Sequence, residues 1–175
     1  VGLELGLFNA LNIEAAYFTE DRTGIFMRRT SLPSSTGLLG VTPYGNIGRV
    51  KSHGVDLSAV YNKQFNKDWS LSLRGTFTFS RNEVVEKDEG DLMYDYMSVV
   101  GHPVNAITGV LVADGLFTSQ EEIDNSPKQQ FGNYTVGDIK YRDLNGDGIV
   151  DGNDVTTAGS PTVPEIQYCI GATVK

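Results

Sequence analysis

The feature that most limits the fold of this chain is a two-residue alternation that begins at Trp69. Polar residues occupy the even positions from Ser70 to Ser80 without a break. The odd positions carry apolar residues or glycine: Trp69, Leu71, Leu73, Gly75, Phe77 and Phe79. An ordinary strand has about five or six residues, whereas a tilted strand that crosses a bilayer needs about 9–11. This length, with aromatic residues at both ends of the apolar set, favours a strand of a membrane β-barrel.

Four shorter segments repeat the alternation. They are residues 3–7, 11–18, 55–62 and 166–174, in which Phe18 and Val60 break the polar sets. A water-soluble antiparallel sheet with one face on a core produces the same pattern, so strand statistics alone leave both folds open. In either case the predicted class is all-β, an antiparallel meander of long alternating strands.

The connections between these segments favour the barrel. Very short turns are expected at residues 8–10 and 66–68, and long connections from about Glu20 to Lys51 and from about Arg81 to Pro164. Outer-membrane barrels alternate short periplasmic turns with long extracellular loops, and a compact soluble domain rarely carries a loop of that second length. Because the smallest single-chain barrels have about eight strands, we expect an oligomer or a piece of a larger barrel. A start at Val1 inside strand-like sequence favours a piece.

A second motif, DLNGDGIVDGND at residues 143–154, has the spacing of a calcium-binding loop. Gly148 stands where the backbone must turn, and Ile149 would offer its main-chain carbonyl. The predicted side-chain ligands are Asp143, Asn145, Asp147, Asp151 and Asp154. A solvated acidic turn is the alternative. Neither flank has helical periodicity and there is one copy, so we expect calcium to fix a long loop rather than to act in a paired sensor.

Composition excludes several functions. A net charge of −8 lacks the footprint of nucleic-acid binding, so no nucleic-acid partner is expected. The single cysteine, Cys169, rules out an intrachain disulfide framework, and two isolated histidines, His53 and His102, argue against a zinc site. No catalytic motif is present, and nothing places carboxylate pairs such as Glu121 and Glu122 across a cleft. The chain is therefore not expected to be an enzyme.

Several other side chains are candidates for lesser roles. In a barrel, Glu14, Asp56 and Arg74 would point into the lumen, mostly as ordinary lumen polarity. Ser119 and Glu122 have capping-box spacing and predict a short helix. Five loop aromatics could contact a partner protein or a sugar ring, although small hydrophobic clusters are the more probable role. They are Tyr94, Tyr96, Phe117, Phe131 and Tyr134.

Several blocks carry a family resemblance over nearly the whole chain. They are Asn46-Ile47-Gly48, then His53 to Leu57, Gly101-His102-Pro103, and Gly137 to Asp143. In this order the chain resembles the C-terminal part of the barrel of SusC/RagA-type TonB-dependent outer-membrane transporters of Bacteroidetes-type bacteria. His53 stands where the family has Asn, and Asp56 where it has Glu.

The resemblance implies more than the residues show. It implies a barrel of twenty-two strands in the outer membrane, surrounded by lipid, that actively imports glycans or peptides. A SusD-like surface lipoprotein would cover it, and TonB would contact an N-terminal part that this chain lacks. Residues 1–175 would then be a piece of the barrel, with 81–165 as a long extracellular loop that carries the calcium-binding segment 143–154. The competing hypothesis is a soluble, secreted calcium-binding β module, either an adhesin or a carbohydrate-binding domain.

Overall fold

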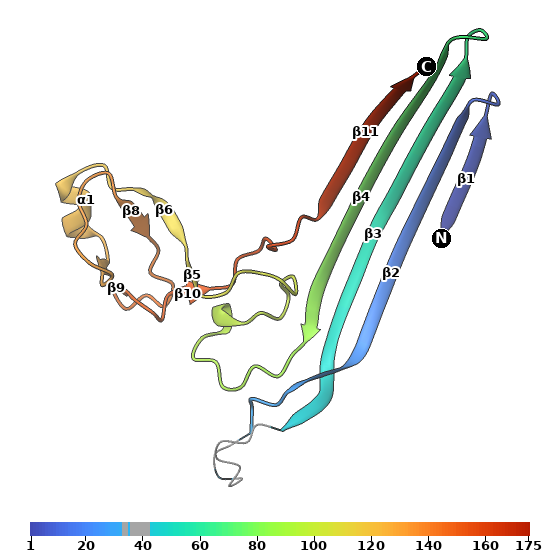
Figure 1. The fold of residues 1–175 in the computed structure, drawn as a ribbon. Helices are drawn as coiled ribbons and strands as arrows, with labels where there is room; N and C mark the ends of the chain where they lie inside the picture. Colours follow the sequence, from blue (N-terminus) through green and yellow to red (C-terminus); the bar gives the residue numbers. More distant parts are fainter. Residues whose placement is uncertain (33–34, 36–42) are drawn as a thin grey trace.

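A computed structural model describes residues 1–32, 35 and 43–175 of the chain. Its main feature is one antiparallel sheet of five strands in the order β1-β2-β3-β4-β11 (Figure 1). The strands are β1 (Gly2–Leu7), β2 (Leu11–Arg28), β3 (Tyr44–Gln64), β4 (Ser70–Glu86) and β11 (Ile166–Val174). The predicted all-β meander is thus confirmed.

The register of the sheet gathers the alternating apolar residues on one side. In one row, Ala15 pairs with Leu57, Leu57 with Phe77, and Phe77 with Tyr168. Directly paired residues point to the same side of a sheet. The apolar face therefore consists of Leu3, Leu5, Leu7, Leu11, Ile13, Ala15, Tyr17, Val55, Leu57, Ala59, Tyr61, Leu71, Leu73, Gly75, Phe77, Phe79, Ile166, Tyr168, Ile170, Ala172 and Val174, with Lys63 as its one charged member in these rows.

The opposite side, the polar face, holds the three predicted lumen residues. Glu14 pairs with Glu4 and Ser58, Asp56 pairs with Thr78, and Arg74 pairs with Val60. Phe18, an exception to the pattern, has a structural reason. It pairs with Gly54, and a Cβ on Gly54 would clash with the Phe18 ring. The Phe18 ring therefore packs over the backbone of Gly54, which has no side chain of its own.

Three strands extend further than the alternation predicted. β2 runs to Arg28 and β3 starts at Tyr44, so the first connection is 29–43 instead of about 20–51; residues 33–34 and 36–42 of it lie outside the described part. β4 runs to Glu86, so the second connection begins at residue 87 and not at 81.

The reason lies in the side chains of these extensions. Charged residues replace apolar ones on the apolar side, as in the row Asp21, Lys51 and Glu83. Arg49 also bridges Asp21 at 2.6 Å and Glu86 at 3.5 Å. The backbone hydrogen bonds between the strands continue here, although both sides of the sheet carry charges. Alternation therefore predicts strands that are too short.

Two tight turns close the other end of the sheet. In the first, Phe8 and Asn9 both have positive φ, 55° and 47°, and the Ala10 amide donates to the Leu7 carbonyl. This is the backbone of a type I′ hairpin turn. In the second, the side-chain oxygen of Asn66 accepts from the amides of Asp68 and Trp69. Both turns were predicted.

The connection of residues 87–165 contains short elements that lie beside the sheet end (Figure 1). They are η2 (Asp95–Met97), β5 (Val110–Leu111), β6 (Ala113–Leu116), α1 (Gln120–Asn125), β7 (Lys128–Gln129), β8 (Ile139–Tyr141), β9 (Ile149–Val150) and β10 (Val155–Thr156). β5 pairs with β10, β6 with β8, and β7 with β9. We call residues 110–157 the loop module. Phe117 and Val150 are its buried hydrophobic residues. Among the described residues, no helix combines the length and apolar character that crossing a membrane requires.

Gly54 provides a test of this packing. Gly54→Ala is expected to destabilise the protein by about 1–3 kcal/mol, because its Cβ would meet the Phe79 carbonyl oxygen as well as the Phe18 ring. Gly75→Ala is the matched control, since a Cβ on Gly75 would meet nothing within 4 Å. Urea unfolding of the protein measures both variants, and equal midpoints for the two would contradict the packing.

Candidate functional site

The acidic segment 143–154 is curled around its own backbone. Both carboxylate oxygens of Asp143 accept amides, from Gly146 at 2.6 Å and from Gly148 at 2.8 Å. Asn145 accepts from the Asp147 amide at 2.9 Å, and Asp147 from the Ile149 amide at 2.8 Å. Gly146 and Gly148 have φ of 77° and 85°, which the curl requires. Three of the predicted ligand side chains, Asp143, Asn145 and Asp147, therefore bond backbone amides of the segment itself.

Asp154 has a different environment from the other carboxylates. It is fully buried, and its oxygens accept from three amides: Leu144 at 2.7 Å, Asn145 at 3.3 Å and Asp151 at 2.8 Å. A buried carboxylate needs such donors to offset its lost hydration. Asp154 thus links the two ends of the segment.

The Ile149 carbonyl, the predicted main-chain ligand, takes no part in the pairing of β7 with β9. The amides of Lys128 and Gln130 donate to the carbonyls of Gly148 and Val150. Successive carbonyls along a strand alternate in direction, so that of Ile149 points away from β7. Among the described residues, no group of three or more His, Cys, Asp or Glu side chains is arranged to hold a metal ion. Calcium at this segment therefore stays a prediction.

Two tyrosines, one just before η2 and one within it, contact the acidic segment. Tyr94 and Tyr96 stack with centroids 5.1 Å apart and planes 7° apart. The Tyr96 hydroxyl donates to the Asn153 carbonyl at 2.6 Å, and the Asn145 amide group donates to the Tyr94 hydroxyl at 3.4 Å. Burial, and then the nearby Asp154 carboxylate, raise the pKa of Tyr96. The pair ties the acidic segment to the start of the connection.

The other loop aromatics form a second cluster, with one exception. Phe117 is 2% exposed and stacks on Tyr134 at 5.4 Å. The Tyr134 hydroxyl accepts from the Gln129 amide at 3.4 Å. Phe131, in contrast, is 55% exposed. Four of the five loop aromatics therefore lie in small clusters that hold the loop in place, the role predicted for them.

The predicted helix α1 begins at the expected cap. Ser119 accepts from the Glu122 amide at 3.1 Å. Glu122 reaches back one residue further than a capping box would, to the amide and hydroxyl of Thr118, and also accepts from Lys140 of β8 at 3.0 Å. The Thr118 amide, followed by Lys140, lowers the pKa of Glu122 from its ordinary 4.5 to about 2. Glu122 therefore connects α1 to β8.

On the polar face, the predicted lumen residues lie in two places. Glu14 and Asp56, together with Glu4, line one shallow groove with Ser58, and Arg74 is not among the residues of that groove. The groove is open and its carboxylates are exposed. This agrees with ordinary lumen polarity, and nothing here identifies a specific contact with a solute.

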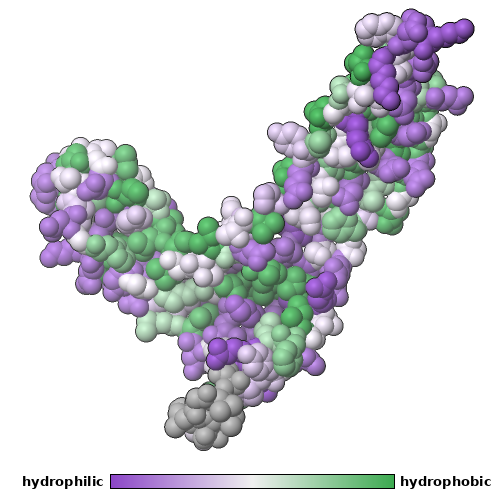
Figure 2. Space-filling model, in the orientation of Figure 1, coloured by the Kyte–Doolittle hydropathy of each residue, from purple (hydrophilic) through white to green (hydrophobic). Residues whose placement is uncertain are grey.

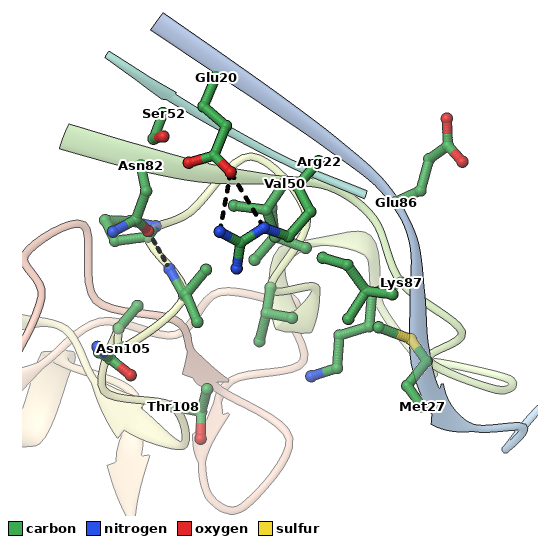
Figure 3. Close-up of a pocket in the computed structure, with 16 residues that line it drawn as sticks. Glu20, Arg22, Met27, Val50, Ser52, Asn82, Glu86, Lys87, Asn105 and Thr108 are labelled. Carbon is green, nitrogen blue, oxygen red and sulfur yellow. Dashed lines mark hydrogen bonds and ion pairs between the residues drawn. The ribbon is translucent and has the colours of Figure 1, made fainter. Parts of the chain in front are cut away.

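Sequence reasoning missed a pocket of about 580 Å³ at the loop end of the polar face (Figure 3). Segment 99–108 folds over the strand extensions there. The Val84 amide donates to the His102 carbonyl at 2.9 Å, and the Gly101 amide donates to the Val84 carbonyl at 2.8 Å. The Asn82 side chain accepts from the Val104 amide at 2.7 Å. Gly101, with φ of 84°, makes this approach possible, which gives the Gly101-His102-Pro103 block a structural reason.

A bulge in β2 shapes the apolar wall of this pocket. The register shifts between Arg22 and Ile25, around Gly24 with φ of 66°. The shift brings Ile25 and Met27 to the pocket, and a Cβ on Gly48 would clash with Met27. Figure 3 shows Arg22 and Glu20 on the same wall, joined at 2.8 Å. In the sequence, only the Asp-Arg-Thr-Gly run at residues 21–24 marks this bulge, because the alternation of apolar and polar residues is interrupted there.

An antiparallel sheet with one apolar and one polar side, tight turns at one end and a long connection at the other defines the wall of a transmembrane β-barrel. The family model described as TonB dependent receptor-like, beta-barrel matches residues 1–164. The chain belongs to this family of outer-membrane proteins, whose members are transporters and not enzymes. This assignment overturns the competing hypothesis of a soluble, secreted calcium-binding β module.

Similar proteins agree with this assignment. The chain is 28% identical, over 96% of its length, to TonB-dependent receptor P26 of Formosa agariphila, of which it spans 17%. Its fold is similar to that of chains in two solved structures. One is the RagAB peptide importer in the closed-closed state, with 19% identity and a TM-score of 0.61 over 98% of this chain and 19% of that one. The other is the RagAB peptide transporter, with 20% identity and a TM-score of 0.65 over 98% and 18%.

Glu122 predicts a pH dependence in the loop module. Because its pKa is lowered on folding, the stability it contributes is complete above about pH 4.5 and is lost as the pH falls toward 2. Amide protection of α1, measured by hydrogen exchange mass spectrometry and corrected for intrinsic rates, should decline over that range. At pH 7, Glu122→Gln should lower it severalfold while Glu121→Gln does not. A pH-independent protection would contradict this role.

Proposed function

We propose that this chain forms part of the barrel wall and an extracellular loop of a TonB-dependent active transporter. The observation that carries the proposal is the five-strand register, which separates a continuous apolar face from a polar one over a family match of residues 1–164. The apolar face meets lipid, and the polar face lines the path of a polar solute. TonB would act on a part of the transporter outside this chain.

The substrate proposed is a peptide or an oligosaccharide. Fold similarity to the RagAB peptide importer makes peptides the first to test. A SusD-like surface lipoprotein is the proposed partner on the loop side, since the loop module projects away from the sheet there (Figure 1).

Uptake by cells tests this directly. A strain that lacks the parent gene should lose growth on either a peptide mixture or a defined oligosaccharide as sole source, and regain it with the intact gene. A complementing gene whose TonB-contacting segment is deleted should fail. Growth of the deletion strain on both nutrients at the wild-type rate would contradict the proposal.

Calcium is proposed as the stabiliser of segment 143–154. The connection 87–165 carries fourteen acidic and four basic side chains, so a cation would relieve strong self-repulsion. The side-chain oxygens of Asp143, Asn145, Asp147 and Asp151 each accept one hydrogen bond, so each keeps a lone pair for a cation. One oxygen of Asp154 already accepts two amides, so only the oxygen that faces Asp151 keeps a lone pair. Asp154 is therefore the weakest ligand of the set. The Ile149 carbonyl completes it.

Asp147→Ala is expected to loosen the loop without unfolding the sheet. In wild-type protein at about 1 mM calcium, limited proteolysis within 87–165 should be severalfold slower than after chelation, and the variant should lose this difference. Asp91→Ala, an exposed carboxylate of the same connection, is the control. Equal cleavage of the wild type with and without calcium would contradict the calcium site and leave the transporter proposal unaffected.

A further inference from the structure

The apolar face contains one charge that its surroundings do not explain. Lys63 pairs with Leu71, and its neighbours on the same side are Tyr61 of β3 and Phe65, which lies just beyond the end of that strand. The apolar face carries no carboxylate, and none of the ion pairs in the described part of the chain includes Lys63. A charge on the lipid side of a barrel is costly at the midplane and much less so near the interfaces. The position of Lys63 along the strand therefore decides its role.

Lys63 lies just inside the turn end of the sheet. The Phe65 amide donates to the Trp69 carbonyl at 3.0 Å, so these two residues form the next row beyond Lys63 and Leu71. Both rings are exposed, Phe65 by 63% and Trp69 by 58%. Exposed aromatic rings mark the level of the lipid headgroups, and short turns mark the periplasmic side. One row corresponds to about 7 Å along a strand, which the flexible stem of a lysine can nearly span.

The sheet is also notched beside Lys63. The β1–β2 hairpin ends at its turn, where the Asn62 amide donates to the Ala10 carbonyl at 2.7 Å. The β3–β4 hairpin continues past this level, so its turn stands beyond that of β1–β2 (Figure 1). Phe8, 91% exposed, lies at the end of the shorter hairpin. Hydrophilic residues gather at this end of the sheet (Figure 2). A headgroup can therefore approach the Lys63 ammonium from the side on which β2 has ended.

We propose that Lys63, with Phe65 and Trp69, binds an anionic phospholipid of the periplasmic leaflet. The Lys63 ammonium pairs with the headgroup phosphate, the two rings lie at the glycerol level, and an acyl chain runs along Leu71 and Leu73. An anionic lipid is favoured because the unpaired positive charge needs a net negative partner. A zwitterionic headgroup brings its own cation, which offsets the attraction.

The test uses the full-length parent with Lys63→Leu, Lys63→Arg, and Lys128→Ala as the matched control in the loop module. Lys63→Leu continues the apolar face, so assembly of the barrel is expected, and the heat-dependent shift in gel mobility checks it. Each protein is placed in nanodiscs of phosphatidylcholine and phosphatidylglycerol, and native mass spectrometry counts the lipids that stay bound.

Wild-type protein should retain phosphatidylglycerol in preference to phosphatidylcholine. Lys63→Leu should reduce that preference by about fivefold, the effect of one basic side chain at an anionic surface. Lys63→Arg and Lys128→Ala should keep it. An absence of preference in the wild type, or an equal preference in Lys63→Leu, would overturn the proposal, whereas neither result bears on the transported solute.

Discussion

The structure depends on one constraint: a two-residue period held in register across the four antiparallel ladders of the sheet. A slip of one residue in any ladder would move a whole strand's apolar set to the polar side. The buried hydrophobic residues among those described, Val84, Phe117 and Val150, all lie at or beyond the loop end of the sheet. In the rows between the turn end and the loop end of the sheet, apolar side chains are exposed. Tyr168 is 77% exposed and Ile170 is 84% exposed. Lipid and neighbouring strands supply the surroundings that a core supplies in a soluble domain.

Beyond the apolar rows a different set of interactions takes over. The strand extensions are held by the backbone ladder and by exposed ion pairs such as Arg49 with Asp21, which add little each in water. The loop module has too few apolar residues for a large core. It relies on the Phe117–Tyr134 stack within it, on the Tyr94–Tyr96 stack that contacts it, and on the buried Asp154. Three hydrogen bonds from backbone amides to Asp154 fix the acidic segment in place. A hard cation would add to this arrangement without replacing it.

Alternation predicted the membrane part of the fold because the bilayer imposes a period on each strand separately. Helix α1 and the short turns were equally predictable, since their signals are local. Strand ends were not. From Thr19 to Arg28 the side chains on both sides are largely polar, and the bulge at Gly24 changes the face of Ile25 and Met27. The pocket beside them could not be predicted, because segment 99–108 meets β4 through backbone bonds that leave no side-chain pattern. The buried state of Asp154 was also hidden, since its spacing equals that of an exposed ligand.

The most direct test of the register is a nitroxide scan of the full-length parent in lipid, with Cys169 first replaced by Ser. Single labels at Leu57, Ser58, Thr76 and Phe77 sample two adjacent rows on both strands. Power saturation should show oxygen accessibility, the signature of lipid, at Leu57 and Phe77, and accessibility to a water-soluble nickel complex at Ser58 and Thr76. The same accessibility at both members of each neighbouring pair would contradict a sheet with one lipid face and one lumen face.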